Sequence, residues 1–207
     1  MSREYRAFLS CVSSEFESVR ELVTRDLAAK GLIVCWQNAF RHDLGATTLL
    51  RLLHDYIREC DVVLCFHGMR SGACPPPATT APFQAMLPPQ MAQASFMQWE
   101  FFFALYYNKP VFQFRSHNRF QPSRSDGVDV PGLQQQFLNF IDHEIGSLIQ
   151  FFGDVTELRL LVMKVEWPRR TGILSRGLFS LSSKIWSSIQ RYFSRRDATT
   201  ITFGRPT

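Results

Sequence analysis

Residues 95–114 read SFMQWEFFFALYYNKPVFQF, and this stretch carries the signals of a helix and of a strand that follows it. Ser95 is a favourable N-cap residue, and Gln98 stands three positions later, where a capping box places Glu or Gln. Asn108 suits the C-cap, and the proline two residues beyond it is poorly placed to continue a helix. The apolar run 111–114 is typical of a short buried strand. The stretch therefore predicts a helix that leads directly into a strand.

One carboxylate, Glu100, lies inside this predicted helix. Its neighbours at helical spacing are Phe96, Phe103, Ala104 and Tyr107. Glu100 therefore shares the face that packs on the core, where a carboxylate needs a partner, a raised pKa or a chemical role. One interpretation is structural, with Glu100 favoured by the helix dipole or paired with Arg41 or Arg115. The other is a nucleophile or electrostatic stabiliser that cleaves a sugar–base bond through an oxocarbenium-like transition state.

The composition of the 207 residues is that of a globular protein, with 45% hydrophobic and 20% charged residues. The net charge is +5, but much of the basic excess follows residue 168, which favours a basic tail over a nucleic-acid groove. The five cysteines include no CxxC pair, which predicts reduced thiols in a cytoplasmic protein and neither a disulfide scaffold nor a metal site. The apolar runs are too short for a signal peptide or a spanning helix.

Apolar runs and amphipathic stretches alternate along the chain. Strands are predicted over residues 5–12, 32–36, 62–66, 111–114 and 148–152. The helices between them begin at a capping box over residues 14–17, at Thr47 or Thr48, at Ser95 and at Leu133, and a last helix covers residues 155–165. This alternation predicts an α/β fold with a central, mostly parallel five-stranded sheet between two helical layers. Ligands of such sheets bind at the carboxyl ends of the strands.

Two segments depart from this alternation. Residues 71–93 are rich in Pro, Ala, Thr and Gly and have no period, which predicts a mobile insertion or lid. From residue 172 the spacing predicts a basic amphipathic helix, so we expect a domain over residues 1–168 and a helix with a linker or tail over 169–207. This helix could lie on a membrane surface, or pack on the domain, on another copy or on a following domain.

Two further groups of side chains are candidates. Cys65 and His67 share one face of a predicted strand, where they form either a nucleophilic pair or part of the core. Ser10, Ser13 and Ser14 stand between a strand and a helix N-terminus, a position that binds anions, although capping alone also explains Ser14. The sequence contains no GxGxxG or Walker A motif, so a glycine-cradled phosphate site is not supported.

Three segments, in this order, resemble the DUF4062 family: residues 8–20 (FLSCVSSEFESVR), 58–68 (RECDVVLCFHG) and 98–111 (QWEFFFALYYNKPV). The resemblance covers about residues 5–116 and extends more weakly to residue 167. The proline-rich insertion departs from the family, in which this loop is short. The family is similar to TIR domains and, more remotely, to nucleoside 2-deoxyribosyltransferases, so the resemblance implies a flavodoxin-like, three-layer αβα fold.

The resemblance also implies a chemistry for Glu100. In enzymatic TIR domains the matching glutamate is needed to cleave the nicotinamide–ribose bond of NAD, and in the transferases it is the nucleophile on the deoxyribose. It thus implies that Glu100 is catalytic in an NAD or nucleotide glycohydrolase, with neither a cofactor nor a metal ion. The substrate-binding residues are then expected to be Phe8, Ser10, Phe40, Arg41 and Trp99.

The resemblance further implies an effector or signalling domain of an immune, antiviral or stress-response protein. Such a domain is expected in the cytoplasm, active on self-association, and fused to or docked on a signalling NTPase. The alternative is a non-enzymatic protein-interaction module in which Glu100 is an ion-pair partner and the insertion and tail are docking surfaces. A third interpretation is an adaptor bound to a membrane surface through the basic helix.

Overall fold

The computed structural model describes residues 4–37, 46–124, 126–145 and 148–167, apart from the side chains of 46–48. Five parallel strands form its centre in the order β2-β1-β3-β4-β5, namely β1 (Tyr5–Cys11), β2 (Leu32–Cys35), β3 (Val62–His67), β4 (Val111–Ser116) and β5 (Ile149–Phe152). All four strand pairs are parallel. The predicted α/β sheet is therefore confirmed, and it is entirely rather than mostly parallel.

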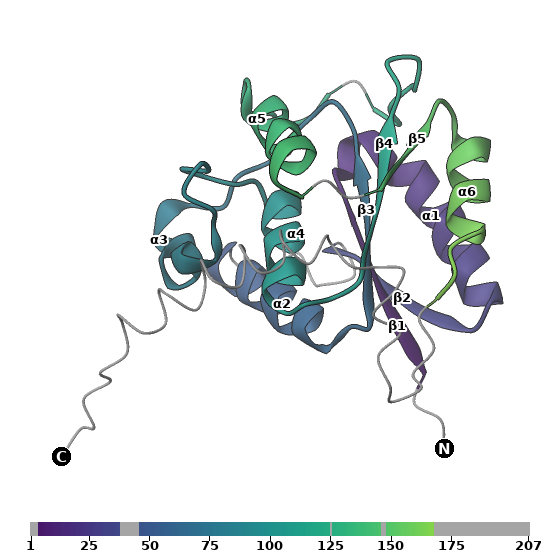
Figure 1. Cartoon of the computed structure of the whole chain (residues 1–207), viewed down its shortest axis with the longest axis horizontal. Helices are drawn as coiled ribbons and strands as arrows, with labels where there is room; N and C mark the ends of the chain where they lie inside the picture. Colours follow the sequence, from purple (N-terminus) through teal and green to yellow (C-terminus); the bar gives the residue numbers. More distant parts are fainter. Residues whose placement is uncertain (1–3, 38–45, 125, 146–147, 168–207) are drawn as a thin grey trace.

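Helices cover both faces of this sheet, which gives the expected three layers (Figure 1). One face carries α1 (Ser13–Ala29) and α6 (Val155–Met163), and the other carries α2 (Ala46–Glu59), α4 (Phe96–Tyr106) and α5 (Leu133–Phe140). The strand order places the topological switch point between β1 and β3, where sheets of this kind bind their ligands at the carboxyl edge.

Strand β1 contributes to both cores because its residues alternate between the two faces. Leu9 and Cys11 point toward α1 and α6, whereas Phe8 and Val12 join the core under α2 and α4. Ser10 stands between Phe8 and Val12 in this alternation. A fully buried polar side chain of β1 therefore points toward α4.

The capping box predicted for α4 is confirmed. The Gln98 backbone N–H donates to Ser95 Oγ at 3.3 Å, and the Ser95 N–H donates to Gln98 Oε1 at 3.0 Å. The C-cap is Tyr107, one residue before the predicted position, and Asn108 follows it with a left-handed φ of 52°. Residues 97–105 of α4 are all buried, so Glu100 lies in a helix that is enclosed on every side.

The prediction that residues 71–93 form a mobile insertion or lid is wrong. The segment contains a helix, α3 (Pro77–Thr80), and a 3₁₀ turn, η2 (Ala81–Met86). Phe83, Leu87 and Met91 are buried in the core formed with α2 and α4. Isolated apolar residues in a proline-rich segment have no helical or strand period, so the sequence pattern could not show that they pack.

The starts of two helices also differ from the predictions. Helix α1 begins at Ser13 after an N-cap at Val12 without a side-chain cap, so the capping box over residues 14–17 is wrong. Helix α2 begins at Ala46, before the predicted caps. The helix predicted over residues 133–145 is formed by α5 and by a π-helical turn, η3 (Ile141–Ile145), that continues it. Within the described residues no helix is long and apolar enough to cross a membrane, and the predicted basic helix lies outside them.

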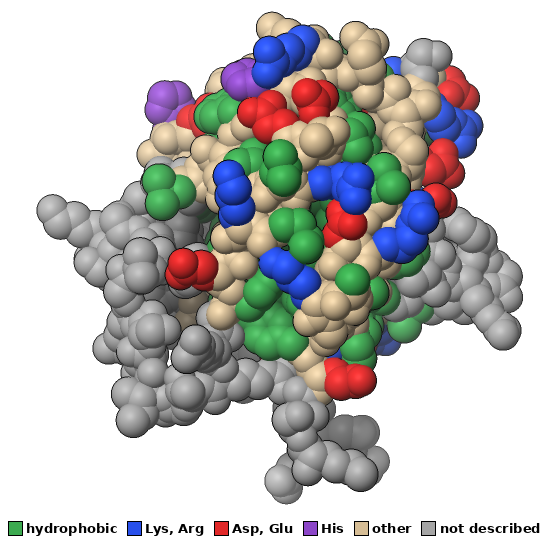
Figure 2. All heavy atoms as spheres, turned by 90° about the vertical axis from the view of Figure 1, so that its right-hand side faces the viewer, with side chains coloured by type: hydrophobic (Ala, Val, Ile, Leu, Met, Phe, Trp, Pro, Cys, Tyr) green, Lys and Arg blue, Asp and Glu red, His purple; other side chains and the backbone are tan. Residues whose placement is uncertain are grey.

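Charges of both signs are interspersed with apolar side chains on the face formed by α1, α6 and β5 (Figure 2). An example is the pair between Arg159 of α6 and Asp26 of α1, with Nε and Oδ2 2.7 Å apart. No continuous basic stripe is visible on this face of the described chain, as would be needed for a phosphate backbone.

Candidate active site at the carboxyl edge of the sheet

The fold joins Glu100 of α4 to Ser10 of β1. Ser10 Oγ lies 2.6 Å from Glu100 Oε2, to which it donates a hydrogen bond, and 3.4 Å from the Met97 carbonyl oxygen. Ser10 is 0% exposed and Glu100 is 1% exposed. The contact forms because Ser10 faces α4 near the carboxyl end of β1 while Glu100 stands one turn inside α4.

Burial raises the pKa of Glu100 to about 8, although the Ser10 hydrogen bond and the positive charge of Arg20 act in the opposite direction. At neutral pH most of the Glu100 carboxyl is therefore protonated. Its second oxygen, Oε1, has no hydrogen-bond partner within the described residues. A ligand that carries positive charge can promote the ionisation of such a carboxyl and bind its free oxygen.

The suggested ion pair between Glu100 and Arg115 is wrong. Arg115 Nη1 lies 2.9 Å from Asp142 Oδ2, in the part of the sheet's carboxyl edge that β4 forms. A surface hollow of about 680 Å³ lies there, lined by residues 115–119 and by Phe151. Arg41, the other suggested partner, lies outside the described residues.

The predicted substrate-binding residues fall into three groups. Ser10 contacts Glu100 directly, and Phe8, which shares its strand face, is fully buried with its ring 5.8 Å from that of Tyr56. Trp99 is fully buried in an aromatic cluster with Phe83. Phe40 and Arg41 lie outside the described residues. Their binding roles stay predictions.

Cys65 and His67 do not form a nucleophilic pair. Both are fully buried, and a ring nitrogen of His67, Nε2, lies 3.0 Å from Gln113 Oε1. Burial lowers the pKa of His67 to about 4 and raises that of Cys65 well above its usual value, so at neutral pH the imidazole and the thiol are both uncharged. Among the described residues no group of three or more His, Cys, Asp or Glu side chains could hold a metal ion.

Sequence reasoning missed two charged residues of α1 that are buried at this edge. Glu15 accepts hydrogen bonds from the backbone N–H groups of Met69 and Arg70, at 2.9 and 3.2 Å, and so holds the loop after β3. Arg20 Nη1 donates to Ser13 Oγ at 3.0 Å. Helical periodicity does not separate such residues from solvated charges, but both stand in the segment 8–20 that carries the family resemblance.

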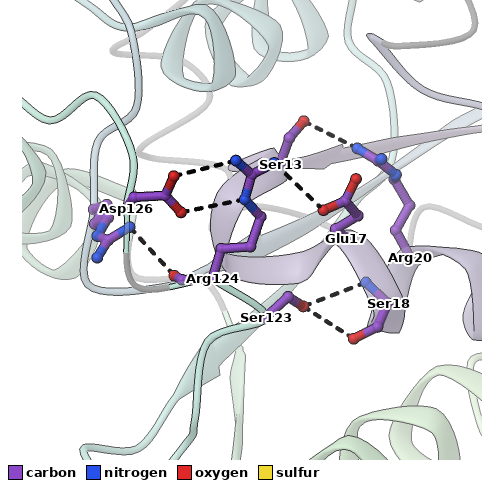
Figure 3. A network of polar contacts seen from close by, with 8 residues as sticks. Ser13, Glu17, Ser18, Arg20, Ser123, Arg124 and Asp126 are labelled. Carbon is purple, nitrogen blue, oxygen red and sulfur yellow. Dashed lines mark hydrogen bonds and ion pairs between the residues drawn. The ribbon is translucent and has the colours of Figure 1, made fainter.

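The loop after β4 crosses the first turn of α1 (Figure 3). The N–H groups of Ser123 and Arg124 each donate at 2.8 Å, to the carbonyl oxygens of Glu15 and Ser14 respectively. The Arg124 side chain also pairs with Asp126, with 3.2 Å between Nη2 and Oδ2. This loop fixes the start of α1 beside the end of β1.

The sequence matches the family model described as "Domain of unknown function (DUF4062)" over residues 6–165. No curated protein matches the chain. Among solved structures, the CMP N-glycosidase BcmB of Clostridium botulinum shares 15% identity at a TM-score of 0.46, over 76% of this chain and 96% of that one. A 2-desoxiribosyltransferase from Leishmania mexicana shares 14% identity at a TM-score of 0.38, over 67% and 98%. Likenesses at this level carry no argument about activity.

Proposed function

The chain belongs to the DUF4062 family, and from this premise we propose that it cleaves the N-glycosidic bond of NAD or a related nucleotide through Glu100. The observation that carries the proposal is the buried Ser10–Glu100 pair at the carboxyl edge of a parallel sheet. Once this carboxyl ionises, with one oxygen oriented by a hydroxyl and the other free, it supplies the negative charge that an oxocarbenium-like transition state needs.

In the proposed reaction the ionised Glu100 carboxylate attacks the anomeric carbon. The new C–O bond forms as the C–N bond breaks, and the electron pair of that bond stays on the base nitrogen. Nicotinamide leaves NAD as a neutral molecule and needs no proton. Water then attacks the same carbon, loses a proton to solvent and releases Glu100 as a carboxylate. The Ser10 hydroxyl, already within 2.6 Å, orients the carboxylate in both steps.

A cationic base favours this mechanism because its positive charge promotes ionisation of the neutral Glu100 carboxyl. The positive nicotinamide ring of NAD would lower the pKa of Glu100 on binding, since an opposite charge nearby stabilises the carboxylate. Glu100 is 1% exposed in this conformation, so substrate reaches it only after a movement at the carboxyl edge. We assign that movement to self-association of the domain in immune or stress-response signalling.

The pH dependence of cleavage tests the role of Glu100 ionisation. Below pH 8, kcat/KM for NAD is expected to rise about tenfold per pH unit and then to level off, because this parameter reports the ionisation of the free enzyme. Nicotinamide release by the assembled full chain between pH 5.5 and 9.5 measures it. In Ser10→Ala the rising limb should move to higher pH, since the Ser10 hydrogen bond lowers the pKa of Glu100. A flat profile between pH 6 and 8 would contradict the proposal.

The second candidate function is a non-enzymatic interaction module. It is favoured by one observation, the near-complete burial of Glu100, which is what a purely structural carboxyl also shows. Turnover separates the two functions. If an assembled wild-type chain releases no base from NAD or from nucleoside monophosphates at pH 8.5, where Glu100 is largely ionised, the interaction module is the better description.

A further inference from the structure

Arg20 is a buried cation without a carboxylate partner. Its side chain is in α1 and is 5% exposed, and its guanidinium lies 5.7 Å from the centre of the Trp36 ring. Nη1 donates to Ser13 Oγ at 3.0 Å, whereas Nε is buried and has no hydrogen-bond partner. Within the described chain no Asp or Glu forms an ion pair with it.

The acids near Arg20 are engaged elsewhere. Glu15 binds the backbone of the loop after β3, and Glu17 lies 3.8 Å from Arg124 on the surface. Glu100 is held by Ser10 on the other side of β1. An uncompensated buried charge costs several kcal/mol, and the Trp36 ring, the Ser13 hydroxyl and the Cys11 thiol, which also interacts with Arg20, offset only part of that cost. Within the described residues no anion supplies the rest of the compensation.

The position of Arg20 indicates where such an anion would come from. Ser13 is the first residue of α1 and is half-buried, so its hydroxyl connects Arg20 to the surface (Figure 3). The start of a helix also favours negative charge. Ser10 and Ser13 stand three residues apart where β1 ends, so the anion site and the Glu100 site flank the same strand end. A ligand that spans this strand end would contact both.

We propose that Arg20 and Ser13 bind a phosphate group of the substrate, so that the site selects nucleotides over free nucleosides. This inference rests on the proposed function and specifies its substrate class. The guanidinium offers Nε and a second nitrogen in the planar arrangement that holds phosphate through two parallel hydrogen bonds. Arg20 acts as a binding residue, and its effect on Glu100 is limited to a lowering of the pKa of that carboxyl.

Binding measured without turnover tests the phosphate site. Full-length Glu100→Gln protein is titrated calorimetrically at constant ionic strength with two pairs, AMP with adenosine and nicotinamide mononucleotide with nicotinamide riboside. We expect each nucleotide to bind at least about tenfold more tightly than its nucleoside, as charge-assisted hydrogen bonds predict. Adding Arg20→Met should reduce this ratio to about twofold or less and change nucleoside affinity little. The exposed Arg25→Met on the same helix should preserve it.

Further variants keep the test decisive if Arg20→Met does not fold. Arg20→Lys retains the charge but loses the planar arrangement, so it should show an intermediate ratio, and Ser13→Ala should lower the ratio several-fold. Inorganic phosphate should raise the Tm of the parent more than chloride at equal ionic strength, and Arg20→Lys should weaken this effect. The proposal is overturned if the parent binds neither nucleotide, if the ratio survives in Arg20→Lys and Ser13→Ala, or if Arg25→Met loses it equally.

Failure of this inference is distinguishable from failure of the proposed function. If nucleotides bind through Arg20 but the wild-type chain releases no base, the phosphate site stands and the glycohydrolase proposal fails. If wild-type protein cleaves nucleosides and nucleotides with equal kcat/KM, the glycohydrolase stands and the phosphate site fails. Stabilisation by inorganic phosphate without any preference for nucleotides would assign the site to free phosphate and would also overturn the inference.

Discussion

Glu100→Gln is expected to reduce base release by about 10³-fold or more and, at the same time, to remove a loss of stability that the wild-type protein suffers as pH rises. The loss of activity follows because an amide can neither attack the anomeric carbon nor neutralise its positive charge. The effect on stability follows from the burial of Glu100, which is 1% exposed. A functional carboxyl placed in an apolar core is therefore expected to destabilise the fold that holds it.

The sign of the pH effect follows from the two protonation states. The folded pKa of Glu100 is about 8, against an ordinary value of 4.5, so between these values the folded chain holds a proton that the unfolded chain has released. The stability contributed by the neutral carboxyl is fully present below pH 4.5 and is lost as pH rises to about 8. The loss is on the order of a few kcal/mol, and glutamine, which does not titrate, avoids it.

Urea unfolding at pH 5 and at pH 8.5 measures this difference. The glutamine amide places an N–H₂ where an oxygen now lacks a partner, which costs about 1–3 kcal/mol at every pH. The change in relative stability between the two pH values is therefore the informative quantity, and it should favour Glu100→Gln at pH 8.5. Glu21→Gln, at an exposed position of α1, is the control. Parallel pH dependence of wild type and Glu100→Gln would refute a neutral buried carboxyl.

Phe83→Ala is expected to lower the free energy of unfolding by about 3 kcal/mol or more and the Tm by roughly 6–12 °C. Phe83 belongs to the proline-rich segment 71–93, but its side chain is buried. The centre of its ring lies 4.8 Å from that of His54 and 5.2 Å from that of Phe103. Removing the ring leaves a cavity between α2 and α4. The expected cost is therefore that of a core substitution.

Thermal and urea unfolding of the full chain measure the effect of Phe83→Ala. Gln84→Ala is the matched control, because the adjacent side chain is exposed on the same turn and should change stability by less than about 0.5 kcal/mol. If Phe83→Ala is as stable as Gln84→Ala, the segment does not belong to the core, and the prediction of a mobile insertion or lid would be correct.

The five strands and the helices α1, α2, α4, α5 and α6 could be predicted from the sequence, whereas α3 and the turn η2 could not. Apolar runs alternating with amphipathic stretches predicted all five strands, and the capping box at Ser95 and Gln98 located the start of α4. These features follow from local chemistry, since period and capping depend on residues within one or two turns of each other. The same local pattern singled out Glu100 as a carboxylate on a core-facing helix.

The tertiary structure alone decided which polar groups are buried and what they contact. Ser10 meets Glu100 across 90 residues, Glu15 reaches the loop after β3 across 54, and Arg20 is buried without a carboxylate partner in the described chain. The order of strands in the sheet creates these contacts. No local period encodes it, because the free energy of burying a polar group depends on partners that arrive from distant parts of the chain.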